Sequence, residues 1–188
     1  MAWSGVRQFV RFAATPAWTR GGPEKRAERR RVRRGLHMAE SGEPVAVFMI
    51  GARINRLRKV RSWLPVVAAM PAMLKELADD PDSGLLGYRL LMGPDLGEVT
   101  IVQYWRRTGD IRAFAGDADR GHLPAEQAFW ARYAKSDGAI GIWHEMYSVR
   151  AGAYHALYGD MHATGLGAFR DTKSLEYSGH GNPVPVGE

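Results

Sequence analysis

Cysteine is absent from this chain of 188 residues. Its absence excludes disulfide bonds, iron–sulfur clusters, zinc–cysteine sites and thiol catalysis, and it fits a reducing compartment such as the cytoplasm, where we expect the protein to reside. No hydrophobic run approaches the roughly 20 residues that a membrane-spanning helix requires. Hydrophobic residues make up 45% and charged residues 24%, which is typical of one globular domain of ordinary size.

Several motifs of common enzyme classes are also missing. The sequence has no phosphate-binding loop, no dinucleotide fingerprint and no G-x-S-x-G nucleophile turn. His144 and Glu145 resemble the start of the zinc-protease motif H-E-x-x-H, but position 148 is Ser, and successive residues of a strand point to opposite faces. We therefore predict no metal site.

The net charge of +6 is concentrated at the N-terminus. Residues 1–37 hold ten of the 26 basic residues and two of the 20 acidic ones, a net charge of +8, whereas the rest of the chain has a net charge of −2. The charge therefore does not indicate a nucleic-acid-binding domain in the body of the chain.

We interpret residues 1–37 as a basic leader that is helical or disordered. Three explanations of it remain open: an organellar transit peptide, an arm that binds nucleic acid or an anionic membrane, or an upstream extension of a protein whose translation starts at Met38. Residues 38–170 are predicted to form the folded domain. Residues 171–188, which end in prolines and glycines, are predicted to be a flexible tail.

Hydrophobic patterns in the body predict strands and helices in alternation. A helix from about Ser62 to Leu77 carries apolar residues at three- and four-residue spacing, and Pro71 is expected to kink or split it. A short helix follows Thr108, and a longer one begins near Pro124. The predicted strands are residues 45–50, 85–92, 99–105 and 139–149.

This order of elements predicts an α+β fold, a ferredoxin-like β-α-β-β-α-β unit with an antiparallel sheet. Its helices would cover one face of the sheet. Since the strands carry apolar residues on both faces, the second face also needs a cover, and we expect two copies to pair as a homodimer.

His144 is the strongest candidate for a functional residue. It shares a strand face with Ile140, Ile142 and Met146, so its imidazole is expected in apolar surroundings. There it would be a general base or the axial ligand of a haem, and the structural alternative is a hydrogen-bonded core histidine. Further candidates for the axial ligand are His122 and His155.

Other polar and aromatic side chains of the strands are candidates for the same site. Glu145 and Tyr147 share the opposite strand face, where they would form a catalytic polar pair over the helices or a dimer contact. The abundant Trp and Met residues are explained by a hydrophobic core or by an aromatic-lined pocket. The residues expected to line a substrate pocket are Gln103, Tyr104, Trp105, Trp143 and Arg53.

Six features, in order along the chain, resemble a family of monooxygenases related to the antibiotic-biosynthesis-type monooxygenase of the fumagillin pathway. They lie within residues 45–169 and are VAVFMIGARINR, WLPVVAAMPAML, VQYW, His122 before the second long helix, GIWHEMY and AYHALYGDMHATGLG. The chain differs from the family pattern at His155, where Glu is usual, and at His162, where Pro is usual.

The resemblance implies a dimeric α/β barrel, in which two ferredoxin-like units place their sheets face to face. Its wider superfamily includes cofactor-free, quinone-forming monooxygenases and haem enzymes such as chlorite dismutases and aldoxime dehydratases. We therefore predict an oxidative tailoring enzyme of secondary metabolism that acts on an apolar or aromatic small molecule between sheet and helices.

Two chemistries and one alternative class remain open. The enzyme would be cofactor-free, with dioxygen as co-substrate and His144 as base, or haem-dependent, with His144, His122 or His155 as axial ligand. The alternative is a non-catalytic module that binds haem or an apolar ligand and docks on an acidic partner through the basic leader.

Overall fold

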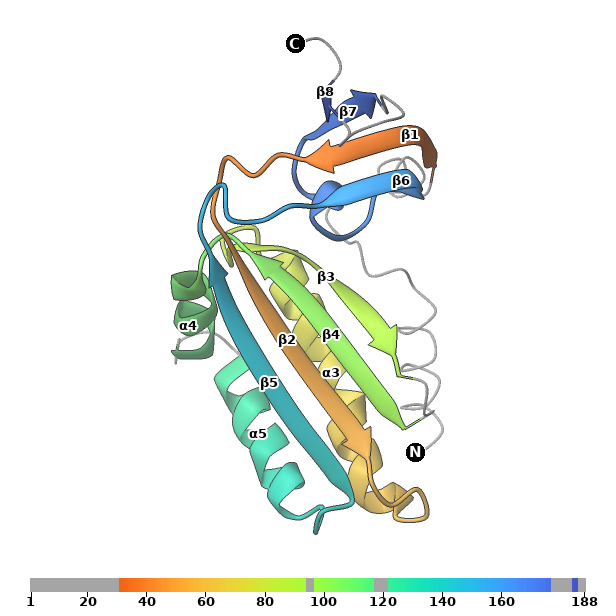
Figure 1. Cartoon of the computed structure of the whole chain (residues 1–188). Helices are drawn as coiled ribbons and strands as arrows, with labels where there is room; N and C mark the ends of the chain where they lie inside the picture. Colours follow the sequence, from red (N-terminus) through yellow and green to blue (C-terminus); the bar gives the residue numbers. More distant parts are fainter. Residues whose placement is uncertain (1–30, 94–96, 117–121, 177–183, 186–188) are drawn as a thin grey trace.

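The computed structural model describes residues 31–93, 97–116, 122–176 and 184–185. Within these ranges the chain forms two four-stranded sheets, and helices cover the larger one (Figure 1). None of the helices in the described part is long and apolar enough to cross a membrane.

The larger sheet has the strand order β3-β4-β2-β5, and each neighbouring pair is antiparallel. This order and the alternation of strands and helices confirm the predicted α+β, ferredoxin-like fold. The elements along the chain are β2 (Val45–Ile54), α3 (Val60–Asp79), β3 (Leu85–Met92), β4 (Glu98–Trp105), α4 (Thr108–Gly116), α5 (His122–Ala134) and β5 (Ile140–Val149).

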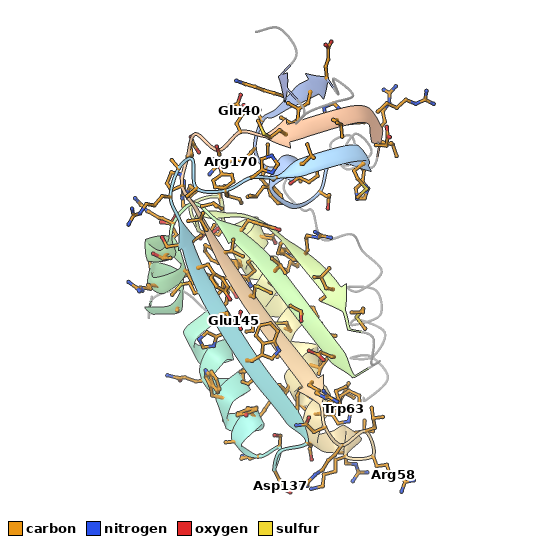
Figure 2. All side chains as sticks on the ribbon, viewed as in Figure 1. Glu40, Arg58, Trp63, Asp137, Glu145 and Arg170 are labelled. Atoms are coloured by element: carbon orange, nitrogen blue, oxygen red, sulfur yellow. The ribbon has the colours of Figure 1, made fainter. Side chains whose placement is uncertain are left out.

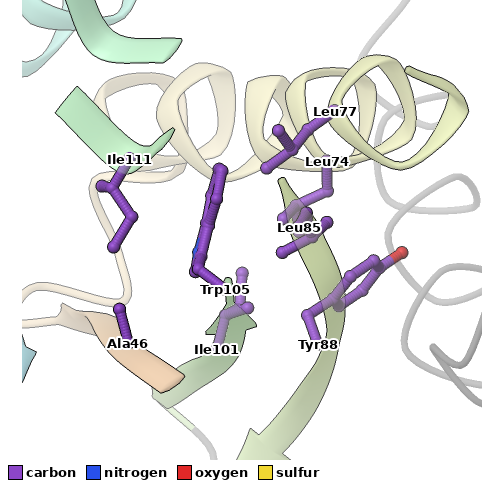
Figure 3. Packing of buried hydrophobic residues seen from close by; sticks show 8 residues of the cluster. All are labelled: Ala46, Leu74, Leu77, Leu85, Tyr88, Ile101, Trp105 and Ile111. Atoms are coloured by element: carbon purple, nitrogen blue, oxygen red, sulfur yellow. The ribbon is translucent and has the colours of Figure 1, made fainter. Parts of the chain in front are cut away.

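The hydrophobic core lies between this sheet and its helices. Figure 3 shows Trp105 of β4 packed between the sheet and the α3 residues Leu74 and Leu77. A second cluster joins Val66 of α3, Phe129 of α5 and Ile140 of β5. Because alternate residues of a strand share a face, these contacts also decide which polar residues face the helices.

Helix α3 runs without interruption from Val60 to Asp79, although it contains Pro65 and Pro71. The predicted split at Pro71 is therefore wrong. Buried side chains lie on both sides of it, Val66 before and Leu74 after, and this packing stabilises one continuous helix. The helix also begins before Ser62, since Lys59 occupies the N-cap position and no side chain caps the first turn.

A smaller sheet, which the sequence analysis does not predict, lies beyond one end of the larger one (Figure 1). Its strand order is β6-β1-β7-β8, with β1 paired to both β6 and β7. The 3-10 helix η1 (Gly165–Ala168) connects two of these strands. The strands are β1 (Val32–Ala39), β6 (Leu157–His162), β7 (Thr172–Glu176) and β8 (Val184–Pro185).

This sheet corrects both predicted ends of the domain. Residues 32–37 belong to β1 and are neither helical nor disordered, so the leader assignment is wrong for this part; residues 1–30 lie outside the described residues. The flexible tail is likewise wrong for residues 172–176 and 184–185. The basic side chains at exposed positions of β1 leave no clear hydrophobic period in its sequence, so the sequence does not indicate a strand there. In the structure Leu36 of β1 pairs with Leu175 of β7.

Candidate functional site

The two faces of the larger sheet differ in what covers them. Helices cover the face that carries Ile101, Gln103 and Trp105, and the paired β5 residues on that side include His144, which lies opposite Ile50. The face away from the helices, called the open face below, carries Tyr104, which pairs with Val47. The alternation predicted for the strand that carries His144 is therefore correct.

A cavity of about 520 Å³ lies between the sheet and the helices. We call it the polar chamber, because its lining includes the polar or charged residues Gln103, Arg112, His144 and Glu145. The rest of the lining is mainly apolar and comes from β2, β4, β5, α3, α4 and α5. Its main apolar lining residues are Phe48, Ile50, Met70, Leu74, Leu77, Trp105, Ile111, Phe114, Phe129, Trp130 and Met146.

Gln103 and Trp105 form a buried hydrogen-bonded pair at the floor of this chamber. The indole Nε1 of Trp105 donates to Oε1 of Gln103 at 2.9 Å, and the two residues are 1% and 5% exposed, respectively. Since an indole N–H can only donate, the bond orients the amide oxygen toward Trp105 and leaves the amide NH₂ as the remaining donor of Gln103. The pair thus satisfies a buried polar group within an apolar floor.

His144 lies at the edge strand of the sheet, where its imidazole borders the polar chamber. Its ring centroid is 5.6 Å from that of Phe48, with the two planes tilted by 43°. The residue is exposed at the chamber mouth and is not a buried core histidine. An imidazole in this position can exchange a proton with a bound molecule while it packs against an aromatic wall.

The polar chamber also offers the groups that a haem requires. His144 supplies an imidazole, the walls are mostly apolar, and Arg112 supplies a cation for a propionate. These residues fit a haem by type. No set of three or more His, Asp or Glu side chains in the described ranges is placed to hold a metal ion by itself.

A second cavity, of about 250 Å³, lies between the same sheet and helix α3. We call it the apolar chamber, because every described side chain that lines it is apolar. Ile50, Met70 and Phe129 line both chambers, so the two cavities are neighbours. The other lining side chains are Ala52, Ile54, Leu57, Trp63, Leu64, Val66, Val67, Met92, Val99, Ile101 and Ile142.

Three of the five predicted pocket residues lie on the open face and line neither chamber. The indole of Trp143 covers Gly51, where an added Cβ would fall 2.3 Å from the ring. Arg53 follows on the same face of β2 and is exposed. Tyr104 packs against Phe169, with ring centroids 6.1 Å apart. A single pocket of all five residues is therefore wrong, because the sheet separates Tyr104, Trp143 and Arg53 from Gln103 and Trp105.

Burial raises the pKa of the Tyr104 hydroxyl above its ordinary value of 10.0, and the nearby Arg89 partly opposes this shift. The ring of Phe169 also covers Gly87, where a Cβ would fall 2.1 Å from it. The segment around η1 therefore shields part of the open face from solvent.

Glu145 and Tyr147 form the predicted polar pair, but on the open face. The Tyr147 hydroxyl donates to Oε2 of Glu145 at 2.5 Å, and this hydrogen bond raises the pKa of Tyr147. The helices lie on the His144 face, so the expectation that the pair lies over the helices is wrong. Glu145 is nevertheless among the residues that line the polar chamber beside His144, whereas Tyr147 is not. Figure 2 labels Glu145 on β5.

The other candidate histidines lie in different places. His122 is the first residue of α5, but its side chain is outside the described part. His155 is exposed in the segment before β6 and lines neither chamber. His162 ends β6 opposite Val32. Among the described histidines, only His144 borders the polar chamber. The sequence analysis does not identify Arg112 and Met70 as lining residues, because only the placement of their helices brings them to this chamber.

An antiparallel sheet with helices on one face defines a domain of the ferredoxin-like class, and two cavities lie between that sheet and its helices. The chain belongs to the monooxygenase af470-like family, whose sequence model matches residues 45–166. The match runs from β2 to η1 and includes both chambers and His144, and it confirms the predicted monooxygenase family.

The fold is also similar to a solved structure of aldoxime dehydratase in complex with butyraldoxime. The TM-score is 0.52 and the sequence identity 18%, over 87% of this chain and 44% of the dehydratase chain. The chain therefore spans less than half the length of that protein, and the likeness concerns the fold alone. None of the curated proteins compared with the chain matches it.

Proposed function

We propose that the protein is a monooxygenase that oxidises an apolar, electron-rich aromatic molecule in the polar chamber. The observation that carries this proposal is the position of His144, a titratable side chain that borders a mainly apolar cavity of about 520 Å³. A chamber of this size between sheet and helices suits a small organic molecule.

His144 acts as the general base. A bound phenol places its hydroxyl beside the imidazole, which takes the proton and leaves an electron-rich phenolate. The Gln103 amide, whose oxygen is occupied by Trp105, donates its NH₂ toward the substrate oxygen. The aromatic walls, which include Phe48 and Phe114, pack against the substrate ring.

The reaction balances with dioxygen as the sole oxidant. The phenolate transfers electrons to dioxygen, a carbon–oxygen bond forms on the ring, and the O–O bond breaks. A phenol and one dioxygen then give a quinone and one water, and each product receives one of the two oxygen atoms of dioxygen. The chain's part is to bind the ring, accept the hydroxyl proton at His144 and exclude bulk water from the ring carbon.

A haem is the competing cofactor for the same chamber. His144 would hold its iron, Arg112 would pair with a propionate, and the bound haem would supply the activation of dioxygen. An absorption titration of the purified protein with haemin tests this role. We expect loose binding without a sharp Soret band; a band that saturates at one haem per subunit, and that His144→Ala abolishes, would assign His144 to haem ligation.

Oxygen consumption tests the proposed reaction. The wild-type protein is supplied with a panel of apolar phenols and hydroquinones, and dioxygen uptake is compared with that of His144→Ala and of His155→Ala as a matched control. General-base catalysis contributes about 10²–10⁴-fold, so His144→Ala should reduce the rate by that factor and His155→Ala should not. Equal rates for wild type and His144→Ala would contradict the proposal.

A further inference from the structure

The polar and apolar chambers meet at three apolar side chains from three different elements. Ile50 of β2, Met70 of α3 and Phe129 of α5 line both cavities. Among the described residues, no polar or charged side chain lines both chambers. Met70 is an unbranched, flexible side chain that adapts readily to the shape of a ligand. The boundary is therefore one that a bound molecule can cross.

The two chambers differ in the polarity of the residues that line them. The polar or charged residues that line the polar chamber are Gln103, Arg112, His144 and Glu145. Every side chain of the apolar chamber is apolar, and the indole Nε1 of Trp63, which could serve as a donor there, is hydrogen-bonded to the backbone oxygen of Leu57 at 3.1 Å. The combined space has one polar end and one end at which the described residues offer a ligand no free side-chain donor or acceptor.

We propose that the two chambers form one elongated site for an amphipathic molecule with an aromatic, hydroxylated head and a hydrocarbon tail. The head lies beside His144 and the tail lies in the apolar chamber, past Met70. The position of the head rests on the proposed function, whereas the position of the tail rests on the apolar lining alone.

The far end of the apolar chamber reaches the surface. Leu57 and Met92 line it and are 65% and 52% exposed. A tail that fills the chamber therefore emerges between these residues. Methylene groups beyond that point remain exposed to water and add no affinity. The site predicts an affinity that rises with tail length and then reaches a plateau.

Para-alkylphenols of increasing chain length test this inference on the wild-type protein. The dissociation constants of phenol, para-ethylphenol, para-butylphenol and para-hexylphenol are measured by isothermal titration calorimetry. Each methylene buried in the chamber should tighten binding about fourfold, which corresponds to about 0.8 kcal/mol per buried CH₂. An affinity that does not change with chain length would overturn the inference.

Two substitutions fill the apolar chamber from opposite walls. Val67→Phe acts from α3 and Val99→Phe from β4, and both residues line the apolar chamber but not the polar one. Each should remove most of the gain in affinity beyond para-ethylphenol and leave the affinity for phenol unchanged. The exposed Val32→Phe in the smaller sheet is the matched control and should keep the whole chain-length series. Thermal unfolding checks that the variants fold, which the free volume of about 250 Å³ favours.

The outcomes separate this inference from the proposed function. A chain-length gain that Val67→Phe and Val99→Phe both abolish supports the elongated site, whatever His144→Ala does to turnover. A His144-dependent reaction without any chain-length gain leaves the proposed function standing and overturns the elongated site. A gain that survives both filling substitutions places the tail elsewhere and also overturns it.

Discussion

The indole of Trp143 lies directly over the backbone of Gly51, with two of its ring atoms 2.3 Å from where a Cβ would stand. The two residues are paired neighbours on β5 and β2, on the open face of the sheet. Any side chain at position 51 therefore has to displace the indole. This contact explains why a glycine occupies the middle of a central strand, where its lack of a side chain is otherwise unfavourable.

Gly51→Ala should lower the free energy of unfolding by about 1–3 kcal/mol, because the new methyl group forces the indole out of its place. Urea denaturation followed by circular dichroism measures this loss. Gly109→Ala is the control, since nothing lies within 4 Å of a Cβ at that position of α4, and alanine favours a helix. Equal stability of Gly51→Ala and wild type would contradict the close contact.

Gln103→Leu should lower the free energy of unfolding by about 1–3 kcal/mol, because it leaves the buried indole N–H of Trp105 without its acceptor. The same substitution in a Trp105→Phe background should cost clearly less, since no N–H is then stranded. A double-mutant cycle by chemical denaturation gives the coupling energy between the two residues. A coupling energy near zero would mean that the hydrogen bond does not stabilise the fold.

Tyr104 should make the fold sensitive to alkaline pH. Burial raises its pKa in the folded state above 10.0, so the unfolded chain ionises first, and the stability that the neutral hydroxyl contributes is lost as pH rises from about 10 through the raised pKa. Tyr104→Phe lacks this ionisation and should lose stability less steeply over that range. Unfolding curves at a series of alkaline pH values measure the two slopes, and identical slopes would show that Tyr104 is not protected from ionisation.

Deletion of residues 1–37 should destabilise the protein more than deletion of residues 1–31. The longer deletion removes residues 32–37 of β1, which lies between β6 and β7 in the smaller sheet. Both neighbours then lose backbone hydrogen bonds, and the melting temperature should fall by at least about 2–4 °C relative to the shorter deletion, the shift expected from about 1 kcal/mol in a chain of this size. Equal melting temperatures would show that β1 does not contribute to the stability of the fold.

The sequence predicts those parts of the site that depend on strand geometry alone. The two-residue period of β5 places His144 with Ile140 and Ile142, and the structure confirms this grouping. The same period in β4 places Gln103 on one face with Trp105, and Tyr104 on the other. The period does not say which face the helices cover. For this reason the sequence analysis places Tyr104 and Trp143 in the substrate pocket. In the structure both residues lie on the open face, whereas the polar chamber lies on the helix-covered face.

The rest of the fold depends on pairing between distant parts of the chain. Residues 32–39 and 172–176 form neighbouring strands, although each segment alone is short, largely polar and without a clear period. Such pairing is specified by the partner and not by local propensity. Arg112 and Met70 enter the site in the same way, because only the docking of α4 and α3 on the sheet brings them to the polar chamber.

The central claim is that His144 accepts a proton from a hydroxylated ring bound in the polar chamber. The absorption of bound para-nitrophenol tests it most directly, because the phenolate and the phenol absorb at different wavelengths. At a pH below that at which free para-nitrophenol ionises, the wild-type protein should convert the bound probe to phenolate, whereas His144→Gln should bind it as the neutral phenol. Binding of the probe with the same phenolate absorption by both proteins, or as neutral phenol by both, would contradict the claim.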